Sequence, residues 1–515
     1  MFKTLKNDLP ASVVVFFVAL PLCLGIALAS GAPLFSGLIA GIIGGVLVGG
    51  LSGSKIGVSG PAAGLAAIVF AAIATLGYKE FLVAVVIAGV IQILFGVLKL
   101  GIIGYYFPSS VIKGMLTGIG IIIILKQIPY FLGYIPPKGE GTFTAIYNSI
   151  LDISLPSVVI AIIGLLILLL WQEVLIKKHK IFSLIQGPLV AVIVGIIFYA
   201  IFKDSTTLAL EGKNLVNVPI PEDAASFIAQ FSFPEFSAIT NPKVWIVAFT
   251  IALVASLETL LCVEATDKLD PNKNVTPTNR ELFAQGTGNI VSGMIGGLPI
   301  TQVIVRSSAN IQSGGLSKMS AIIHGFLLLI SVIIIPRLLN MIPLSVLAAV
   351  LLIVGYKLAK PALFKKMYNL GWKQFIPFTV TVLGIVFIDL LWGIGLGLAV
   401  GIVVILIKSY QNSHFLHKED KSNGVQKMKM TLAEEVTFFN KGSILKELDA
   451  LPKDSYLELD VTKTRYLDND IIEILEDFAF KAKQRNIDIK LISERGEIEN
   501  PPSYIEFFKL RPKSA

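Results

Sequence analysis

Residues that could bind an anion interrupt one apolar stretch of the chain, which reads Gly296-Gly297-Leu298-Pro299-Ile300-Thr301-Gln302-Val303-Ile304-Val305-Arg306. The glycines and the proline break a helix, and Thr301 and Gln302 fall in the first turn of the next one. A helix that begins at membrane depth points its free N–H groups and its positive dipole end at whatever precedes it, which favours an anion. Arg306 shares a face with Gln302 and adds a full positive charge. The alternative is a Gly/Pro kink in a packing helix, with Arg306 reaching toward an interface.

A single acidic residue, Glu258, lies within the apolar segment Ser256-Leu257-Glu258-Thr259-Leu260-Leu261-Cys262. Burial of a carboxylate favours its protonated form, so Glu258 could carry a proton, whereas a sodium ion beside it would keep it ionised. An acid within a membrane segment predicts a functional role, here as a proton carrier or as the partner of a cation. The alternative is a structural acid that pairs with Arg306. Asp389, near the end of a later apolar segment, is a weaker candidate that could instead be interfacial.

No feature of the sequence favours an enzyme. The four histidines are scattered, and no metal-ligand cluster, nucleophile motif or phosphate-binding loop occurs in the sequence. We therefore expect no catalytic residue, no metal and no cofactor.

The composition of the 515-residue chain is that of a helical membrane protein, because 54% of its residues are hydrophobic, 15% are charged and the mean hydropathy is +0.77. Soluble domains carry roughly 25% charged residues. Lys3 and Lys6 precede the first apolar segment, which we interpret as a span rather than a cleaved signal peptide. Cys23 and Cys262 lie in apolar segments and predict no disulfide framework. The net charge of +8 is explained by basic residues on the cytoplasmic side of a membrane, which argues against a nucleic-acid partner.

The hydrophobic segments predict a multi-pass protein of the inner membrane. Fourteen segments, several of them short, begin near Pro10, Leu34, Pro61, Phe81, Ser109, Leu155, Phe182, Val244, Leu282, Ile300, Ser320, Pro343, Phe375 and Gly393. An even number returns the chain to its starting side. Placing both termini in the cytoplasm puts most of the basic connections there, in agreement with the positive-inside rule.

The two halves of this region carry matching interruptions. The first half contains Gly57-Val58-Ser59-Gly60-Pro61-Ala62-Ala63-Gly64-Leu65, which breaks and restarts a helix as the first motif does. Pro61 and Pro299 hold corresponding places in the two halves, and at nearly the same offset Pro21 corresponds to Glu258. Seven segments per half require the halves to be inverted in the membrane, and paired interrupted segments point to a transporter site at the midplane. The alternative is that Gly and Pro are simply common in membrane helices.

The composition changes after residue 408. Residues 409–426 are polar and charged and predict a linker, whereas residues 427–515 have the pattern of a small soluble α/β domain. We expect a strand-like run at 435–440, alternating strands at 456–461 and 487–492, and an amphipathic helix at 471–485. The predicted domains are thus a transporter domain over residues 1–408 and a cytoplasmic domain over residues 427–515.

In combination, these motifs resemble the SulP family of anion transporters over nearly the whole chain. The resemblance rests on Pro21 in the first span, Gly60-Pro61-Ala62-Ala63-Gly64, Glu258-Thr259-Leu260-Leu261, Asn279-Arg280-Glu281-Leu282-Phe283-Ala284-Gln285-Gly286-Thr287-Gly288-Asn289, Gly297-Leu298-Pro299 and Arg306-Ser307-Ser308-Ala309-Asn310. It implies a 7+7 inverted repeat divided into a core domain and a gate domain, an elevator-type alternating-access mechanism and a homodimer.

The resemblance also implies a substrate site between the starts of the third and tenth helices. The residues it assigns to this site are Pro21, Leu22, Ala63, Gly64, Leu65, Thr301, Gln302, Val303 and Arg306. Backbone N–H groups of the two helix starts would face each other across the anion, and Arg306 would supply a positive field. Glu258 on the eighth helix would couple a cation. Relatives that use sodium carry Asp at that position and Thr at the position of Cys262, so Glu258 with Cys262 favours protons.

The tail resembles the family's STAS domain, with a strand at Leu457-Glu458-Leu459-Asp460-Val461. The family's usual Asp-Ser-Ser-Gly is Asp468-Asn469-Asp470-Ile471 here, so no phosphorylatable serine stands at that position. The domain also ends early compared with the family. We expect it to assist assembly or dimerisation rather than to regulate transport.

These observations together predict a secondary active transporter of inorganic anions, and specifically sulfate:proton symport. Bicarbonate uptake coupled to sodium or protons is the nearest alternative, followed by dicarboxylate uptake. A nucleobase permease would need polar groups that read a base and no basic residue at the site, and a passive anion channel would leave Glu258 without a role. The expected partners are the anion, the coupled proton or sodium ion and membrane lipid, with no nucleic acid.

Overall fold

The computed structural model of the chain describes residues 4–102, 108–137, 140–178, 182, 187–220, 223, 228–388, 390–418, 425–494 and 496–509. The second acidic candidate, Asp389, lies outside these residues. Two compact units make up the chain, Met1–Leu398 and Ala399–Ala515.

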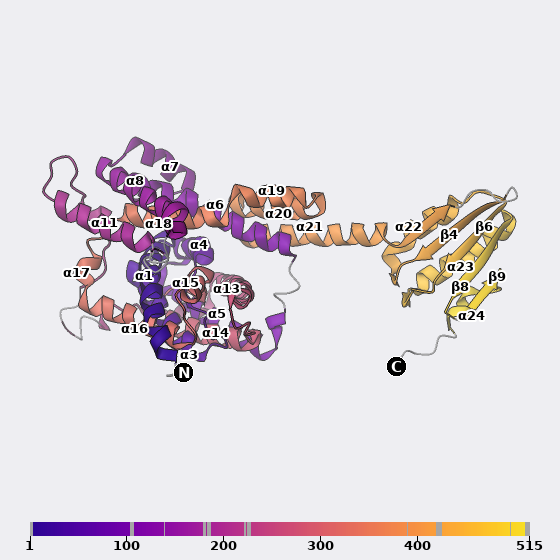
Figure 1. Cartoon of the computed structure of the whole chain (residues 1–515), viewed down its shortest axis with the longest axis horizontal. Coiled ribbons are helices and arrows are strands. Elements are labelled where there is room, and N and C mark those ends of the chain that lie inside the picture. Colours follow the sequence, from indigo (N-terminus) through magenta and orange to yellow (C-terminus); the bar gives the residue numbers. More distant parts are fainter. Residues whose placement is uncertain are drawn as a thin grey trace. The chain divides into compact units, whose positions relative to one another are not determined.

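Long apolar helices make up the first unit (Figure 1). Within the described residues, eight helical spans are long and apolar enough to cross a membrane: Leu5–Ala29, Leu34–Leu51, Tyr78–Val97, Ser109–Leu132, Leu155–Leu175, Pro242–Leu269, Leu344–Asn369 and Trp392–Gln411. Shorter apolar helices lie at Ala63–Leu76, Gly187–Phe202, Met319–Ile334 and Trp372–Phe387. With α14 (Thr278–Met294) and α15 (Ile304–Gln312), a helix occurs at each of the fourteen predicted segments. The chain is therefore a multi-pass helical membrane protein.

The helices of this unit pack as two bundles, one around α5 and α14 and one around α6 and α18. The core bundle contains α1 (Leu5–Ala29), α2 (Leu34–Ile43), α4 (Ala66–Leu76), α5 (Tyr78–Val97), α13 (Pro242–Leu269), α14, α15 and α16 (Met319–Ile334). The gate bundle contains α6 (Ser109–Leu132), α8 (Leu155–Leu170), α11 (Gly187–Phe202), α18 (Leu344–Leu358), α20 (Trp372–Phe387) and the first part of α21 (Leu390–Gln411), a helix that continues into the second unit. In Figure 1, α8, α11 and α18 lie together on one side of the unit, and α5, α13 and α14 lie on the other. Each bundle takes helices from both halves of the sequence, as the predicted repeat requires.

Short elements connect these helices. They are the π-helix η2 (Gly44–Val48), α3 (Gly49–Leu51), α7 (Thr142–Leu151), the π-helix η5 (Trp171–Leu175), α9 (Ile176–Lys178), the 3₁₀ turns η6 (Gly212–Asn214) and η7 (Phe236–Thr240), α17 (Pro336–Leu339) and α19 (Pro361–Asn369).

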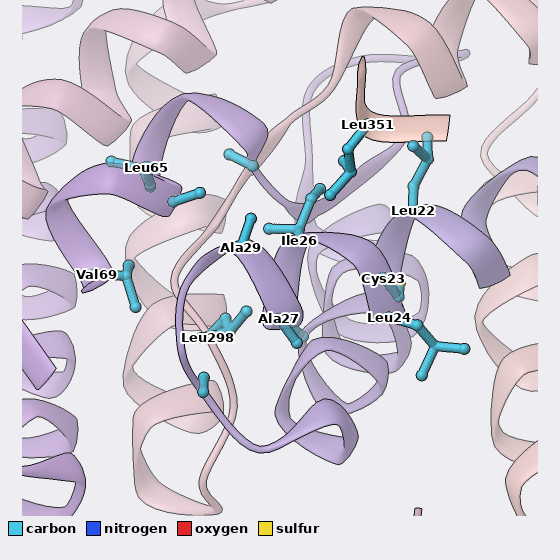
Figure 2. Packing of buried hydrophobic residues seen from close by; sticks show 14 of the residues in the cluster. Leu22, Cys23, Leu24, Ile26, Ala27, Ala29, Leu65, Val69, Leu298 and Leu351 are labelled. Atoms are coloured by element: carbon cyan, nitrogen blue, oxygen red, sulfur yellow. The ribbon is translucent and has the colours of Figure 1, made fainter. Parts of the chain in front are cut away.

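A hydrophobic cluster surrounds α1 and joins it to both interrupted segments (Figure 2). From α1 it includes Leu22, Leu24 and Ile26. From the first interrupted segment it includes Leu65 and Val69, and from the second it includes Leu298. Leu351 joins the cluster from α18. Gly25 permits the close approach of α18, because a Cβ there would lie 3.2 Å from the Leu351 side chain. The first helix therefore connects the interrupted segments to the gate bundle.

The second unit contains an α/β domain with a five-stranded sheet. The strand order is β3 (His414–Lys418), β4 (Gln426–Leu432), β6 (Ser455–Asp460), β8 (Ile487–Ser493) and β9 (Gly496–Glu499), with a parallel centre and antiparallel outer pairs. The remaining elements are β5 (Glu435–Val436), α22 (Lys441–Asp449), β7 (Tyr466–Leu467), α23 (Asn469–Gln484) and α24 (Tyr504–Lys509). Asp468 begins α23 by accepting a hydrogen bond from the Asp470 N–H at 3.1 Å.

Two expectations for this region need correction. The predicted linker at 409–426 begins with the end of α21 and contains β3. Its charged composition is typical of an edge strand, which is the place of β3 in the sheet. The predicted run at 435–440 forms only the two-residue strand β5 before the 3₁₀ turn η8 (Phe438–Asn440), because the Asn440 side chain accepts a hydrogen bond from the Thr437 N–H at 2.8 Å and ends the extended backbone.

Candidate anion site

The two interrupted segments lie against each other as a short antiparallel ribbon. Strand β1 (Ser59–Pro61) pairs with β2 (Ile300–Gln302), and Gly60 stands opposite Thr301. The 3₁₀ turn η3 (Ala63–Leu65) and then α4 follow β1, and α15 follows β2. Because the strands are antiparallel, the two helices leave the ribbon from opposite ends. The interrupted helices therefore meet, with the opposite directions that an inverted repeat requires.

Asn289 of α14 holds the second strand of the ribbon in place. Its Oδ1 accepts a hydrogen bond from the Ile300 N–H at 2.5 Å, and its Nδ2 donates to the Ile300 carbonyl at 3.1 Å. Its Nδ2 also donates to Oε1 of Gln92 on α5 at 2.6 Å, and Gln92 donates to Ser256 on α13 at 3.3 Å. These side chains are buried, so the network fixes the interrupted backbone relative to three neighbouring helices.

Helix α13 presents a polar face to β2 and to the start of α15. Thr259 Oγ1 accepts a hydrogen bond from the Gln302 N–H at 3.4 Å, and Thr266 Oγ1 accepts one from Gln302 Nε2 at 3.1 Å. Between them on the same face, the Cys262 sulfur accepts a hydrogen bond from the Ile304 N–H. The three side chains follow helical spacing of three and four residues. The helix predicted to couple a cation therefore contacts the segment predicted to bind an anion.

Glu258 lies at the start of the other interrupted helix. Its carboxylate accepts a hydrogen bond from the Gly64 N–H. The contact is tight, because a Cβ at position 64 would lie 2.5 Å from Oε2 of Glu258. A helix start attracts negative charge. An ionised Glu258 therefore occupies a position that suits an anion.

Arg306 is fully buried beside the ribbon. Its Nη2 donates a hydrogen bond to Cys23 Sγ on α1 at 3.3 Å, and a Cβ at position 60 would lie 2.1 Å from its Nη1. No ion pair joins Arg306 to Glu258 among the described residues. The alternative interpretation of Glu258 as a structural acid paired with Arg306 is therefore wrong. A buried charge without an opposite partner costs several kcal/mol.

Buried polar atoms around the ribbon have no hydrogen-bond partner in the described part of the chain. They include Glu258 Oε2, Thr301 Oγ1, Gln302 Oε1, and Nε and Nη1 of Arg306. A buried polar group without a partner costs about 1–3 kcal/mol. Since such groups are rare in folded proteins, a cluster of them indicates a binding site. A guanidinium and a hydroxyl are donors, which an anion would satisfy.

Part of the expected donor set is engaged within the protein. The Val303 N–H donates to the Val58 carbonyl at 2.9 Å, and the Leu65 N–H closes the 3₁₀ turn at 3.2 Å. The Gln302 N–H points to α13, as described above. These three backbone groups are therefore not the free donors that the sequence predicts. The ribbon and the 3₁₀ turn satisfy the backbone at the breaks, which the Gly and Pro pattern alone does not reveal.

The contribution of α1 also differs in detail from the expectation. Pro21 and Leu22 are buried in the middle of this helix, but the residue that contacts Arg306 is the next one, Cys23. The sequence singles out Cys23 only as a cysteine in an apolar segment. It likewise includes Asn289 only as part of a motif, although a carboxamide in a membrane helix signals a buried polar contact.

Known proteins resemble this chain over most of its length. The family profile described as "Sulfate permease family" matches residues 5–381. The "Putative sulfate transporter YvdB" of Bacillus subtilis (strain 168) is 27% identical over 93% of this chain and 90% of its own length. The "Bicarbonate transporter BicA" of Picosynechococcus sp. is 26% identical over 84% of this chain and 76% of its own length. A solved structure, the transmembrane domain of a cyanobacterium bicarbonate transporter BicA, matches with a TM-score of 0.65 and 28% identity over 76% of this chain and 98% of that chain.

Proposed function

The chain belongs to the sulfate permease family, and from this premise we propose that it takes up sulfate together with a proton. Like its family and relatives, it is a membrane transporter of anions and not an enzyme. What we propose is the identity of the anion, the identity of the coupled cation and the mechanism of transport.

The observation that carries the proposal is the buried guanidinium of Arg306 beside two helix starts, where its one hydrogen bond in the described structure goes to the Cys23 sulfur. Arg306 has no acidic partner within the described residues, and two of its nitrogen atoms lack hydrogen-bond acceptors. An oxyanion bound at the ribbon would supply those acceptors and would be stabilised by the positive dipole ends of α4 and α15. Thr301 would add a hydroxyl donor.

The position of Glu258 at a helix start supports proton coupling as part of the proposal. When Glu258 is ionised, its carboxylate competes with the substrate for the Gly64 N–H and repels a second negative charge. When Glu258 is protonated, the negative charge is removed and the helix start is open to the anion. Anion binding and protonation of Glu258 therefore favour each other, which is the thermodynamic requirement for symport. The Cys262 thiol beside Glu258 is not an oxygen ligand of the kind that suits sodium.

We propose that the core bundle carries this site across the membrane by an elevator-type movement against the gate bundle. The protein would lie in the inner membrane with both termini in the cytoplasm, as the distribution of basic residues indicates. A homodimer is expected from the family resemblance.

Bicarbonate uptake, with protons or sodium, is the second candidate, because two relatives named as bicarbonate transporters are 26% and 27% identical to this chain, close to the 27% of the putative sulfate transporter YvdB. The ribbon would suit either oxyanion, and it would also suit a dicarboxylate. A nucleobase permease does not explain Arg306, and a passive channel does not explain Glu258.

Uptake into proteoliposomes tests the proposal. Labelled sulfate and labelled bicarbonate are offered under an imposed proton or sodium gradient, with the membrane potential held at zero. One pH unit supplies about 1.4 kcal/mol per proton, enough for about tenfold accumulation at a 1:1 ratio. We expect the proton gradient to concentrate sulfate and the sodium gradient to have no effect. Accumulation of bicarbonate alone, or uptake that no gradient drives, would overturn the proposal.

A further inference from the structure

A cavity of about 660 Å³ lies between the core and gate bundles, apart from the ribbon. Its core side is formed by the ends of α1 and α4, including Ala29, Phe70 and Ile73, and its gate side by α6, including Lys126 and Tyr130. None of the residues predicted to bind the anion lines this cavity. The cavity and the ribbon nevertheless share two helices, because α1 and α4 run from one to the other.

Among the described residues that line the cavity, the one basic side chain is Lys126. Its Nζ lies 3.4 Å from the centroid of the Phe70 ring. No carboxylate of the described residues lies within ion-pair distance of Lys126, and Glu140, which also lines the cavity, accepts hydrogen bonds from Asn148 at 2.5 Å and Tyr134 at 3.2 Å. A lysine within a membrane span is costly and usually functional. The attraction between a cation and the face of an aromatic ring is weak compared with the attraction between a cation and an anion.

The contact between Lys126 and Phe70 lies at the inner limit of the cavity. Phe70, Ile73 and Ala74 are the α4 residues that line it, so Phe70 is the lining residue of α4 closest to the ribbon. At 1.5 Å per residue, Phe70 is about 10 Å along the helix from Ala63. Phe70 belongs to the core bundle and Lys126 to the gate bundle, so their contact joins the two bundles between the cavity and the anion site.

We propose that this cavity is the outer vestibule of the transport pathway and that Lys126 is an anion-binding residue within it. A small oxyanion arriving from outside replaces the Phe70 ring as the partner of the Lys126 ammonium, with the Tyr130 hydroxyl one turn further along α6 on the same wall. Displacement of Phe70 then opens the way along α4 to the ribbon. This inference rests on the proposed function and on the orientation given with it.

Kinetics of uptake by intact cells test the role of the charge. In Lys126→Gln we expect the KM for external sulfate to rise about tenfold while the maximal rate changes less than about twofold, because the charge concentrates the anion before the transport step. The dependence of uptake on ionic strength should weaken, and Lys126→Arg should restore both properties. Lys113→Gln, at the other end of α6, is the matched control and should leave the KM unchanged. Equal KM values for Lys126→Gln and Lys113→Gln would overturn the inference.

Thiol labelling tests the location independently of transport. A Lys126→Cys variant should react with a charged, membrane-impermeant thiol reagent added outside, and sulfate should slow the reaction. The unsubstituted chain, which retains Cys23 and Cys262, gives the background. Absence of external labelling above this background would overturn the vestibule even if the protein transports sulfate. External labelling of a protein that takes up no anion would instead contradict the proposed function and leave the vestibule standing.

Discussion

The carboxylate of Glu258 lies so close to Gly64 that a Cβ at position 64 would be 2.5 Å from its Oε2. The acid expected to couple transport and the site expected to bind the anion therefore share one helix start. Arg306 lies as close to strand β1 of the ribbon, where a Cβ at position 60 would be 2.1 Å from its Nη1. Since no ion pair joins the acid to the base in the described structure, each is available to a ligand.

Gly64→Ala is expected to impair transport without unfolding the protein. The new methyl group would overlap the buried carboxylate of Glu258 and push it from the helix start. We expect sulfate uptake to fall by at least about tenfold, a difference of ~1.4 kcal/mol. Gly50→Ala is the matched control, because a Cβ at position 50 meets nothing within 4 Å. Normal uptake by folded Gly64→Ala would contradict a role for this contact.

Asn289→Leu is expected to loosen the ribbon. The change leaves the N–H and carbonyl of Ile300 and the Oε1 of Gln92 without their buried partner, at about 1–3 kcal/mol for each group that stays unpaired. The Tm should fall by several degrees, and the KM for sulfate should rise. Thr287→Ala, on the same helix, removes only an exposed hydrogen bond and should change the Tm little. A Tm for Asn289→Leu equal to that of Thr287→Ala would contradict the role of Asn289 in holding the ribbon in place.

Removal of the C-terminal domain is expected to leave transport intact. This domain has its own hydrophobic core, and Asp470 stands where the family has a serine, so no phosphorylation switch is expected there. The sequence places the cut near Lys427, but β3 pairs with β4, so a cut after Gln411 avoids an unpaired strand. Uptake is measured in truncated protein that reaches the membrane as a single species. Loss of uptake in such protein would contradict this prediction and point to a regulatory role.

The C-terminal domain should lose stability in acid through Asp460. Burial alone would raise the pKa of Asp460, but hydrogen bonds from Thr462 and Lys429 outweigh it and hold the pKa below its usual value of 3.8. The Lys429 Nζ lies 3.1 Å from Asp460 Oδ2. A carboxyl whose pKa is lowered on folding stabilises the fold above its usual pKa, and this contribution is lost as the pH falls through the lowered value. Asp460→Asn should therefore show weaker hydrogen-exchange protection of β6 than the unchanged chain at pH 7, and the difference should shrink as the pH falls below 3.8 and through the lowered pKa. Equal protection at pH 7 would contradict this.

The sequence predicts the helices and the meeting of the two interrupted segments because these depend on hydrophobic length and on Gly and Pro. The helix breaks around Pro61 and Pro299 leave backbone N–H and C=O groups at membrane depth that need hydrogen-bond partners. The two broken segments supply these partners to each other by pairing as a ribbon. The arrangement of core and gate bundles comes from the family resemblance, since hydrophobicity does not tell which helices pack together.

The sequence does not predict which donors remain free at the site. Whether the Val303 N–H is available depends on Val58, more than 200 residues away, and on the register of a three-residue ribbon. The contact of Arg306 with Cys23 and the contact of Lys126 with Phe70 are equally long-range. Residue type and spacing within one helix carry no information about such contacts, which arise when distant segments pack.

Glu258→Gln is the most direct test of coupling. The substitution is nearly isosteric, so the fold should be kept, but the side chain can no longer gain or lose a proton. A neutral amide at the Gly64 N–H does not repel the substrate, so sulfate binding should persist and exchange of internal for external sulfate should continue. Gradient-driven accumulation should be abolished, and the rise of uptake at low pH should flatten. Sulfate uptake by the variant and by the unchanged chain is therefore measured from pH 5 to pH 8, with exchange as the control for folding. Accumulation against a gradient with an unchanged pH profile would show that another group carries the proton, and Asp389 would be the next candidate.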